Sequence, residues 1–260
     1  MAKRAMSSEK ASFVKKEGHK KENIFAQAIG LGGSYKNDKK AKKDVIDFNG
    51  DGHSVKSATW WQIFLYHKSR IQSDYGFLAM NGMGQLILDC LNVFPDDRNE
   101  YEANKNKFKL ALQKPMKELC EKLQDRNRLK AFLNKAIFNG GEVQFLTVFP
   151  LNDDKRILIF HFEDVVESLA NSFIIENSKA IKTTDISCQK VVFKYDFGKK
   201  PINVGEIEVR NDRDDHYREI KFRLNSPKTV QILLKNITNF DKPEFINGIE
   251  NSSIYRYGKL

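Results

Sequence analysis

The sequence predicts an α/β (α+β) fold in which a mixed central β-sheet is flanked by helices. Apolar residues recur at helical spacing over residues 18–29 and 96–138, which indicates helices. Residues 142–149, 156–162 and 190–197 are rich in β-branched and aromatic side chains, which indicates strands. The chain has 260 residues, of which 40% are hydrophobic, and this is enough for one large core or for a core with an insertion.

We expect four segments along the chain. Residues 1–17 are polar and basic and are expected to form a flexible arm. Residues 18–95 are expected to be the N-terminal part of the core, and residues 96–140 a helical subdomain with helices on both sides of Pro115. Residues 141–260 are expected to be the C-terminal, β-rich part of the core.

The predicted helix over residues 18–29 has an apolar stripe that includes Phe25 and Ile29, and Glu22 lies outside that stripe. Glycines at Gly32-Gly33 end this helix, because glycine readily adopts the left-handed geometry of a helix cap. Glu22 is therefore expected on a solvated face of the helix that leads into the next element.

Ionisable side chains interrupt that next element, a predicted β-hairpin. Two β-type runs, residues 44–48 and 53–57, flank the Asn49-Gly50 turn signal. The hairpin contains Asp44, Asp47, Asp51, His53 and Lys56. Carboxylates bind a hard cation such as Mg²⁺, and a nearby lysine can orient a water molecule or stabilise charge on a phosphate. The pattern is typical of a nuclease site, but acidic turn residues and a lysine on an exposed strand face are also common on solvated surface hairpins.

Residues 57–71 carry Trp61 and Leu65 at helical spacing, so we predict a helix that packs in the core. Lys68 and Arg70 follow these aromatic and apolar residues and are candidates for contact with a DNA backbone.

A second predicted hairpin pairs residues 205–210 with residues 216–224. It offers an alternative catalytic set, Glu208, Glu219 and Lys221, in which the last two share one strand face. A charged face paired across the strands explains the same pattern without catalysis. The hairpin also carries side chains that can donate hydrogen bonds to guanine, namely Arg210, His216, Arg218 and Arg223.

The charge of the chain favours a polyanionic partner. The formal net charge is +10, and residues 1–56 contain 13 Lys or Arg against 7 Asp or Glu. A basic surface favours binding to phosphates through the release of counterions. The three cysteines, Cys90, Cys120 and Cys188, match neither a disulfide framework nor a zinc spacing. No apolar run is long enough for a membrane span, so we expect a soluble cytoplasmic protein.

The stretch from Glu22 to Gln62 resembles the amino-terminal core of a restriction endonuclease of the PD-(D/E)XK superfamily. The resemblance is carried by the helix with Glu22, the Gly32-Gly33 break, Asp44-Val45-Ile46, Ser54-Val55-Lys56-Ser57 and a following helix with Gln62. The later stretch GEIEVRNDRDDHYREIKF also resembles a segment of some type II restriction enzymes.

The resemblance implies a restriction-endonuclease-like core with a helical insertion. It implies that Asp44 binds the metal, that Lys56 is the catalytic lysine and that Glu22 is an accessory carboxylate. The acid of the (D/E)-x-K motif is replaced by Ser54. The metal site would then need Asp47, Asp51 or a backbone carbonyl to complete it.

The resulting hypothesis is a Mg²⁺-dependent type II restriction endonuclease that cleaves double-stranded DNA at a short specific sequence. Symmetric cleavage of a palindrome would favour a homodimer. Two alternatives remain open at this point. One is a non-catalytic, sequence-specific DNA-binding protein, and the other is a metal-independent, base-excising enzyme that uses His216 or Tyr217.

Overall fold

The chain divides into two compact units. The computed structural model describes residues 8–33, 35–39, 41–151, 153, 155–179, 186–212, 214–241, 243–245 and 253–259. Unit 1 comprises Met1–Thr59, Gly141–Val165 and Ile237–Leu260, and unit 2 comprises Trp60–Gly140 and Val166–Asn236. Helices and strands are both abundant, and the strands lie in one sheet in each unit, which confirms the α+β class.

Unit 1 contains a six-stranded mixed sheet in the order β1-β2-β4-β5-β11-β10. The pairs β2–β4 and β5–β11 are parallel, and the other neighbours are antiparallel. Its elements are α1 (Ser8–Ala28), β1 (Val45–Ile46), β2 (Gly52–Lys56), β4 (Phe145–Val148), β5 (Arg156–His161), β10 (Glu244–Phe245) and β11 (Ser253–Tyr257). The predicted strands over residues 142–149 and 156–162 are therefore confirmed as β4 and β5.

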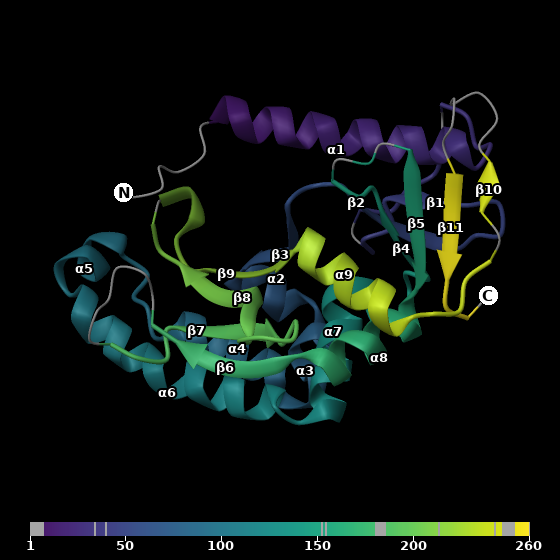
Figure 1. Ribbon diagram of the computed structural model, residues 1–260. Coiled ribbons are helices and arrows are strands. Elements are labelled where there is room, and N and C mark those ends of the chain that lie inside the picture. The colour runs from purple at the N-terminus through teal and green to yellow at the C-terminus, as the bar shows by residue number, and fades with distance from the viewer. Residues whose placement is uncertain are drawn as a thin grey trace. The chain divides into compact units, whose positions relative to one another are not determined.

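Helix α1 lies beside this sheet (Figure 1). It packs against the sheet through an apolar cluster. Phe25 and Ala26 of α1 are fully buried with Val45, Ile157 and Ile254 of the sheet. The helix begins at Ser8, well before the predicted start at residue 18, so part of the predicted arm is helical. Lys, Glu and Ala have high helix propensity, which accounts for the longer helix.

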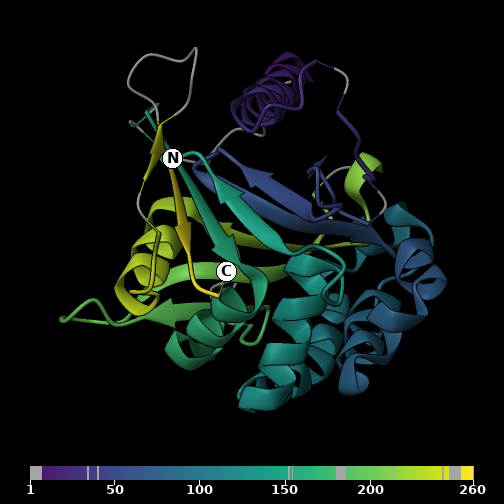
Figure 2. The same cartoon turned by 90° about the vertical axis from the view of Figure 1, so that its right-hand side faces the viewer.

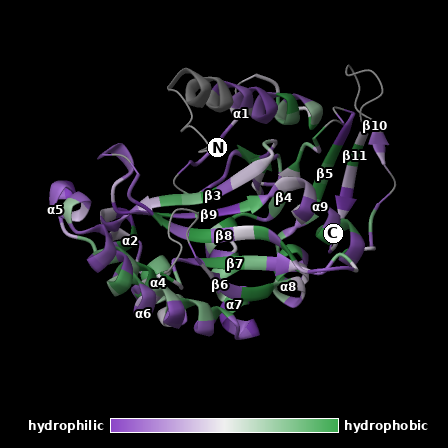
Figure 3. Cartoon of the chain, turned by 60° about the vertical axis from the view of Figure 1, so that its left-hand side comes forward, coloured by the Kyte–Doolittle hydropathy of each residue, from purple (hydrophilic) through white to green (hydrophobic). Residues whose placement is uncertain are grey.

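The C-terminal segment supplies a strand that the sequence pattern did not reveal. Strand β11 runs parallel to β5 (Figure 2). It pairs Ser253 with Arg156 and Tyr257 with Phe160. The middle of β5 is apolar at every position, as expected for a strand whose side chains are buried on both faces (Figure 3).

Unit 2 contains a five-stranded antiparallel sheet in the order β3-β9-β8-β7-β6. Its strands are β3 (Trp60–His67), β6 (Ile174–Ser178), β7 (Lys190–Tyr195), β8 (Ile202–Arg210) and β9 (Glu219–Asn225). Its helices are α2 (Lys68–Ser73), α3 (Tyr75–Ala79), η1 (Met80–Gly82), α4 (Met83–Asn92), α5 (Arg98–Ala103), α6 (Lys105–Leu123), α7 (Arg126–Phe138), η2 (Asp214–His216) and α9 (Ser226–Asn236). Helix α8 (Phe162–Ser172) spans the residue at which unit 1 gives way to unit 2.

The apolar face of the unit 2 sheet packs on helices through phenylalanines. The ring of Phe132 in α7 lies 5.2 Å from Phe222 and 6.4 Å from Phe193, centroid to centroid. Phe64 of β3 adds an edge-on contact to Phe132. This cluster buries one face of the sheet, and the alternate residues of the second hairpin point to the other face, as predicted.

The prediction of a helix over residues 57–71 is wrong for its first part. Trp60–His67 is strand β3, and only Lys68–Ser73 is helical. The register of β3 against β9 shifts between Gln62 and Phe64, which is the mark of a β-bulge. The extra residue places buried side chains at Trp61 and Phe64, a spacing that imitates a helix.

The helices predicted on the two sides of Pro115 are parts of one helix, because α6 continues through the proline. A proline inside a helix leaves the carbonyl four residues earlier without its partner, here that of Ala111. Ala111 is on the exposed side of α6, whereas Leu112 and Met116 are buried and hold the helix in place. Water can satisfy the Ala111 carbonyl, so packing outweighs the lost bond. Among the described residues, no helix is long and apolar enough to cross a membrane.

Candidate functional site

Asp44 lies immediately before the short edge strand β1, and its side chain continues the pairing of the hairpin. Its backbone N–H donates to the His53 carbonyl at 2.8 Å, and its Oδ2 accepts the Val55 N–H, also at 2.8 Å. A strand longer than β1 would accept that second bond with its backbone. The carboxylate is thereby fixed at the edge of the sheet beside the end of β2.

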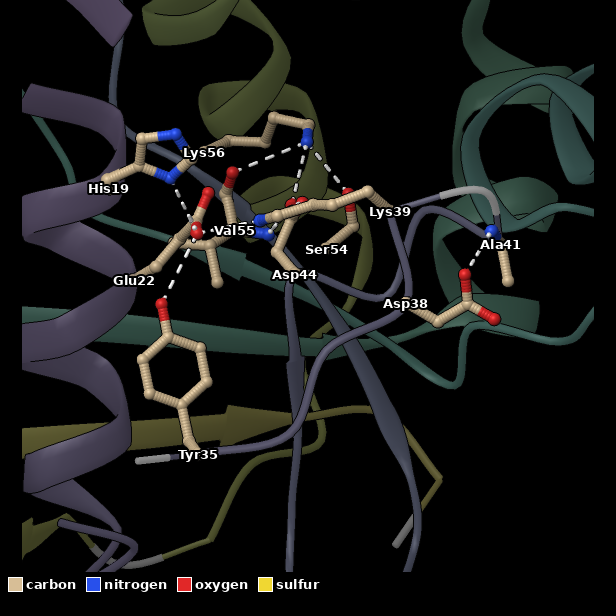
Figure 4. A network of polar contacts seen from close by, with 10 residues as sticks. All are labelled: His19, Glu22, Tyr35, Asp38, Lys39, Ala41, Asp44, Ser54, Val55 and Lys56. Atoms are coloured by element: carbon tan, nitrogen blue, oxygen red, sulfur yellow. Dashed lines mark hydrogen bonds and ion pairs between the residues drawn. The ribbon is translucent and has the colours of Figure 1, made fainter. Parts of the chain in front are cut away.

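Lys56, the last residue of β2, turns its ammonium toward this carboxylate (Figure 4). Its Nζ lies 3.5 Å from Asp44 Oδ2 and donates to Ser54 Oγ at 2.7 Å and to the Val55 carbonyl at 3.3 Å. Ser54 and Lys56 share a strand face, as the two-residue period predicts. The structure therefore brings Asp44, Ser54 and Lys56 together.

Glu22 joins the same cluster from helix α1. It is only 8% exposed, so the expectation of a solvated position is wrong. Glu22 lies three and four residues before Phe25 and Ala26, which places it on the buried face of the helix. Its Oε2 accepts a hydrogen bond of 2.7 Å from the Lys39 ammonium, and His19 Nδ1 lies 3.1 Å from the same oxygen.

Lys39 connects the two carboxylates. Its Nζ lies 2.7 Å from Glu22 Oε2 and 3.5 Å from Asp44 Oδ1. Burial by itself lowers the pKa of Lys39, but the hydrogen bond to Glu22 and the charge of Asp44 outweigh it and raise the pKa. The hydroxyl of Tyr35 donates to Glu22 at 3.4 Å, and burial together with the Glu22 charge raises the pKa of Tyr35. Lys39 and Tyr35 thus stay protonated and donate to the acidic pair.

The predicted site did not include Lys39, Tyr35 or His19. Lys39 stands in a run of lysines whose members have no distinguishing spacing, and Tyr35 is in a loop without periodicity. A tertiary contact with Glu22 is what singles them out, and no local pattern encodes that contact.

Asp47, predicted as a metal ligand, is not part of this cluster. Its Oδ1 accepts the backbone N–H groups of Asn49 at 2.8 Å and Asp51 at 2.9 Å, so it stabilises the turn. Its Oδ2 lies 3.5 Å from Nε2 of the buried His53. Burial lowers the pKa of His53 to about 4, which keeps this imidazole neutral between the Phe25 and Phe145 rings.

The second hairpin forms a ladder of opposite charges on the polar face of the unit 2 sheet. Glu208 pairs with Lys190 and Lys221, while Glu206 pairs with Lys190 at 3.2 Å and with Arg223. Burial opposes the ionisation of Glu208, but the two ammonium groups outweigh it and lower its pKa to about 2. Each of these two carboxylates is paired with two cationic side chains, which is typical of a structural network between neighbouring strands.

Glu219 does not join Glu208 and Lys221, although it shares their sheet face. Its Oε2 lies 2.6 Å from His216 Nδ1. The hydroxyl of Tyr217 donates to the Pro95 carbonyl at 2.7 Å, and burial raises its pKa to about 12. The alternative catalytic set is therefore divided between two separate groups of contacts, Glu208 with Lys190 and Lys221, and Glu219 with His216.

The candidate DNA-contacting groups are also engaged within unit 2. Arg210 forms a two-point pair with Asp212 at 3.1 and 3.0 Å, and Arg218, which is buried, pairs with Asp96. Arg223 lies 4.5 Å from the Trp60 ring. Lys68 and Arg70 fall in the short helix α2, where Arg70 lies 5.6 Å from the ring of Tyr66.

The fit of this cluster to a divalent cation rests on its oxygen atoms. Mg²⁺ and Ca²⁺ prefer carboxylate, hydroxyl and carbonyl oxygens. Glu22 and Asp44 supply two carboxylates, and the Lys39 ammonium already lies between them. Ser54 and the Val55 carbonyl supply neutral oxygens on the side of Asp44 where the Lys56 ammonium lies. Within the described ranges, no three His, Cys, Asp or Glu residues converge on one point, so a cation here would use two carboxylates and neutral oxygens.

No known protein family, no curated protein and no solved structure matches this chain.

Proposed function

We propose that this chain is a Mg²⁺-dependent endonuclease of the type II restriction kind, which hydrolyses phosphodiester bonds of double-stranded DNA. The observation that carries the proposal is the convergence of the Asp44 carboxylate and the Lys56 ammonium, 3.5 Å apart, with Glu22 in the same cluster. The formal net charge of +10 supports a polyanionic substrate.

Glu22 and Asp44 would hold the cation between them, where the Lys39 ammonium lies. Ser54 and the Val55 carbonyl hold the Lys56 ammonium on the other oxygen of Asp44. Glu22 then provides the second negative charge that a serine in the S-x-K sequence lacks. When bound, Mg²⁺ would supply a Lewis acid for the scissile phosphate.

Lys56 has the role of holding the phosphate and the attacking water. Its ammonium is oriented by Ser54, Val55 and Asp44, and its side chain is 20% exposed, so it remains accessible at the end of β2. A preoriented cation stabilises the charge that develops on the phosphate oxygens without first reorganising.

The proposal is tested by cleavage of supercoiled plasmid in Mg²⁺ or in EDTA. Lys56→Ala and Asp44→Asn should each lower the rate by about 100-fold or more, because the first removes the ammonium beside the reacting phosphate and the second removes the charge of a Mg²⁺ ligand. Lys36→Ala is the matched control, since Lys36 is an exposed lysine of the preceding loop. Full cutting by the Asp44 and Lys56 variants would refute this site.

The same assay separates the alternatives. A gel shift without cleavage in any divalent metal would indicate a DNA-binding protein without chemistry. Cutting that survives EDTA would indicate a metal-independent enzyme, but the raised pKa of Tyr217 does not favour that residue as a nucleophile. A twofold-symmetric homodimer belongs to the proposal, and sedimentation with a palindromic duplex would test it.

A further inference from the structure

We propose that Lys39 is a built-in counter-ion of the site, which occupies the place of the divalent cation and is displaced when that cation binds. The inference rests on the metal site of the proposed function, but it concerns the exchange of cations and not the cleavage of DNA.

The contacts of Lys39 are those of a bridging cation. Its ammonium lies 2.7 Å from Glu22 Oε2 and 3.5 Å from Asp44 Oδ1, and these carboxylates come from a helix and from a strand edge (Figure 4). Two carboxylates placed together repel each other unless a cation lies between them. Lys39 removes that repulsion while no divalent ion is bound.

Exposure shows which partner can leave. The side chains of Glu22 and Asp44 are 11% and 17% exposed, whereas that of Lys39 is 45% exposed. The backbone around Lys39 is held by two hydrogen bonds between Asp38 and Lys43, at 2.8 and 2.9 Å. The flexible lysine side chain can therefore swing into solvent while the loop and both carboxylates stay in place.

Lys56 does not have this freedom. Its ammonium also donates to Ser54 and to the Val55 carbonyl, and its side chain is 20% exposed. The two lysines thus have different roles. Lys56 is held in the site, whereas Lys39 can be replaced by a divalent cation.

Charge gives the exchange a direction. Glu22 and Asp44 together balance Lys39 and Lys56, so the cluster is neutral in formal charge. Replacing one ammonium by a divalent ion leaves one positive charge in excess. The site would attract a phosphodiester anion only after the exchange, which couples substrate binding to metal binding.

The first test is calorimetric titration of the full chain with Ca²⁺, which binds oxygen ligands without requiring turnover. Lys39→Met keeps the length of the side chain and removes its charge, so it should bind Ca²⁺ about tenfold more tightly than the wild type, because the competing ammonium is gone. Lys36→Met should bind like the wild type. Equal or weaker binding by Lys39→Met, or no Ca²⁺ binding by either protein, would overturn the inference.

A second test uses the wild-type chain and is independent of how the variant folds. Acetic anhydride labelling, read by mass spectrometry, should modify the Lys39 amine severalfold faster in Ca²⁺ than in EDTA, with Lys36 as the internal reference. An unchanged labelling ratio would refute the exchange. Ca²⁺-dependent release of Lys39 in a chain that cuts no DNA would refute the proposed function and leave this inference standing. Mg²⁺-dependent DNA cleavage with unchanged Lys39 labelling would refute this inference and leave the proposed function standing.

Discussion

Glu208→Gln tests whether the second hairpin is a structural network. Glu208 is paired with Lys190 and Lys221, whose side chains are only 10% and 13% exposed. The substitution keeps the size of the side chain and leaves these ammonium groups without their shared carboxylate. Breaking a buried pair costs about 3 kcal/mol or more of unfolding free energy. The pKa of Glu208, lowered from 4.5 to about 2, corresponds independently to about 3 kcal/mol.

The pH dependence of this difference has a defined sign. A carboxyl group whose folded pKa lies below its unfolded pKa stabilises the fold above the unfolded value and loses that contribution as the pH falls. The difference in unfolding free energy between the wild type and Glu208→Gln should therefore be constant from pH 7 to about pH 5. It should decrease below pH 4.5, toward the folded pKa of about 2.

Urea unfolding followed by tryptophan fluorescence measures this gap. Both tryptophans of the chain, Trp60 and Trp61, lie in β3, which pairs with β9, so the signal reports unit 2. Glu176→Gln is the matched control, because its pair with Lys194 is 47% exposed at the carboxylate and should contribute less than about 1 kcal/mol. Equal stability losses in the two variants would refute the structural role. Unchanged stability with loss of DNA cleavage would move the active site to this hairpin.

Three further predictions concern single positions. Gly84→Ala should lower the unfolding free energy by about 2 kcal/mol, because a Cβ there would lie 2.0 Å from the Phe77 carbonyl oxygen. An unchanged midpoint of thermal unfolding in calorimetry would contradict this prediction. Ser54→Asp restores the acid of the motif and should tighten Ca²⁺ binding about tenfold in a titration, whereas unchanged affinity would place Ser54 outside the metal site. Burial lowers the pKa of His53 to about 4, so its contribution to stability is complete above pH 6.5 and is lost as the pH falls through 4. His53→Phe should flatten that part of the pH profile of thermal unfolding, and an unaltered slope would assign the acid sensitivity to another group.

Local patterns were sufficient for much of the fold. The Asn49-Gly50 turn and the alternation of the second hairpin are set by neighbours in sequence, and both hairpins form as predicted. The pairing of Ser54 with Lys56 follows from the same two-residue period. These features depend on backbone geometry over a few residues, which composition and spacing record.

The remaining features depend on contacts between distant segments. The strand over Trp60–His67 imitated a helix because a bulge shifted its buried positions, and the bulge exists only through pairing with β9. Strand β11 pairs with the edge of β5 that faces away from β4, so its formation depends on a segment about 100 residues earlier in the sequence.

The sequence by itself determined the α+β class, the two hairpins and the candidate pair Asp44 and Lys56. Only the tertiary structure buried Glu22 and placed Lys39 between two carboxylates. The physical reason is that the net charge of an acidic cluster depends on which cation the folded chain brings to it. Lys39 is 17 residues from Glu22 in sequence, so their contact forms only when the chain folds.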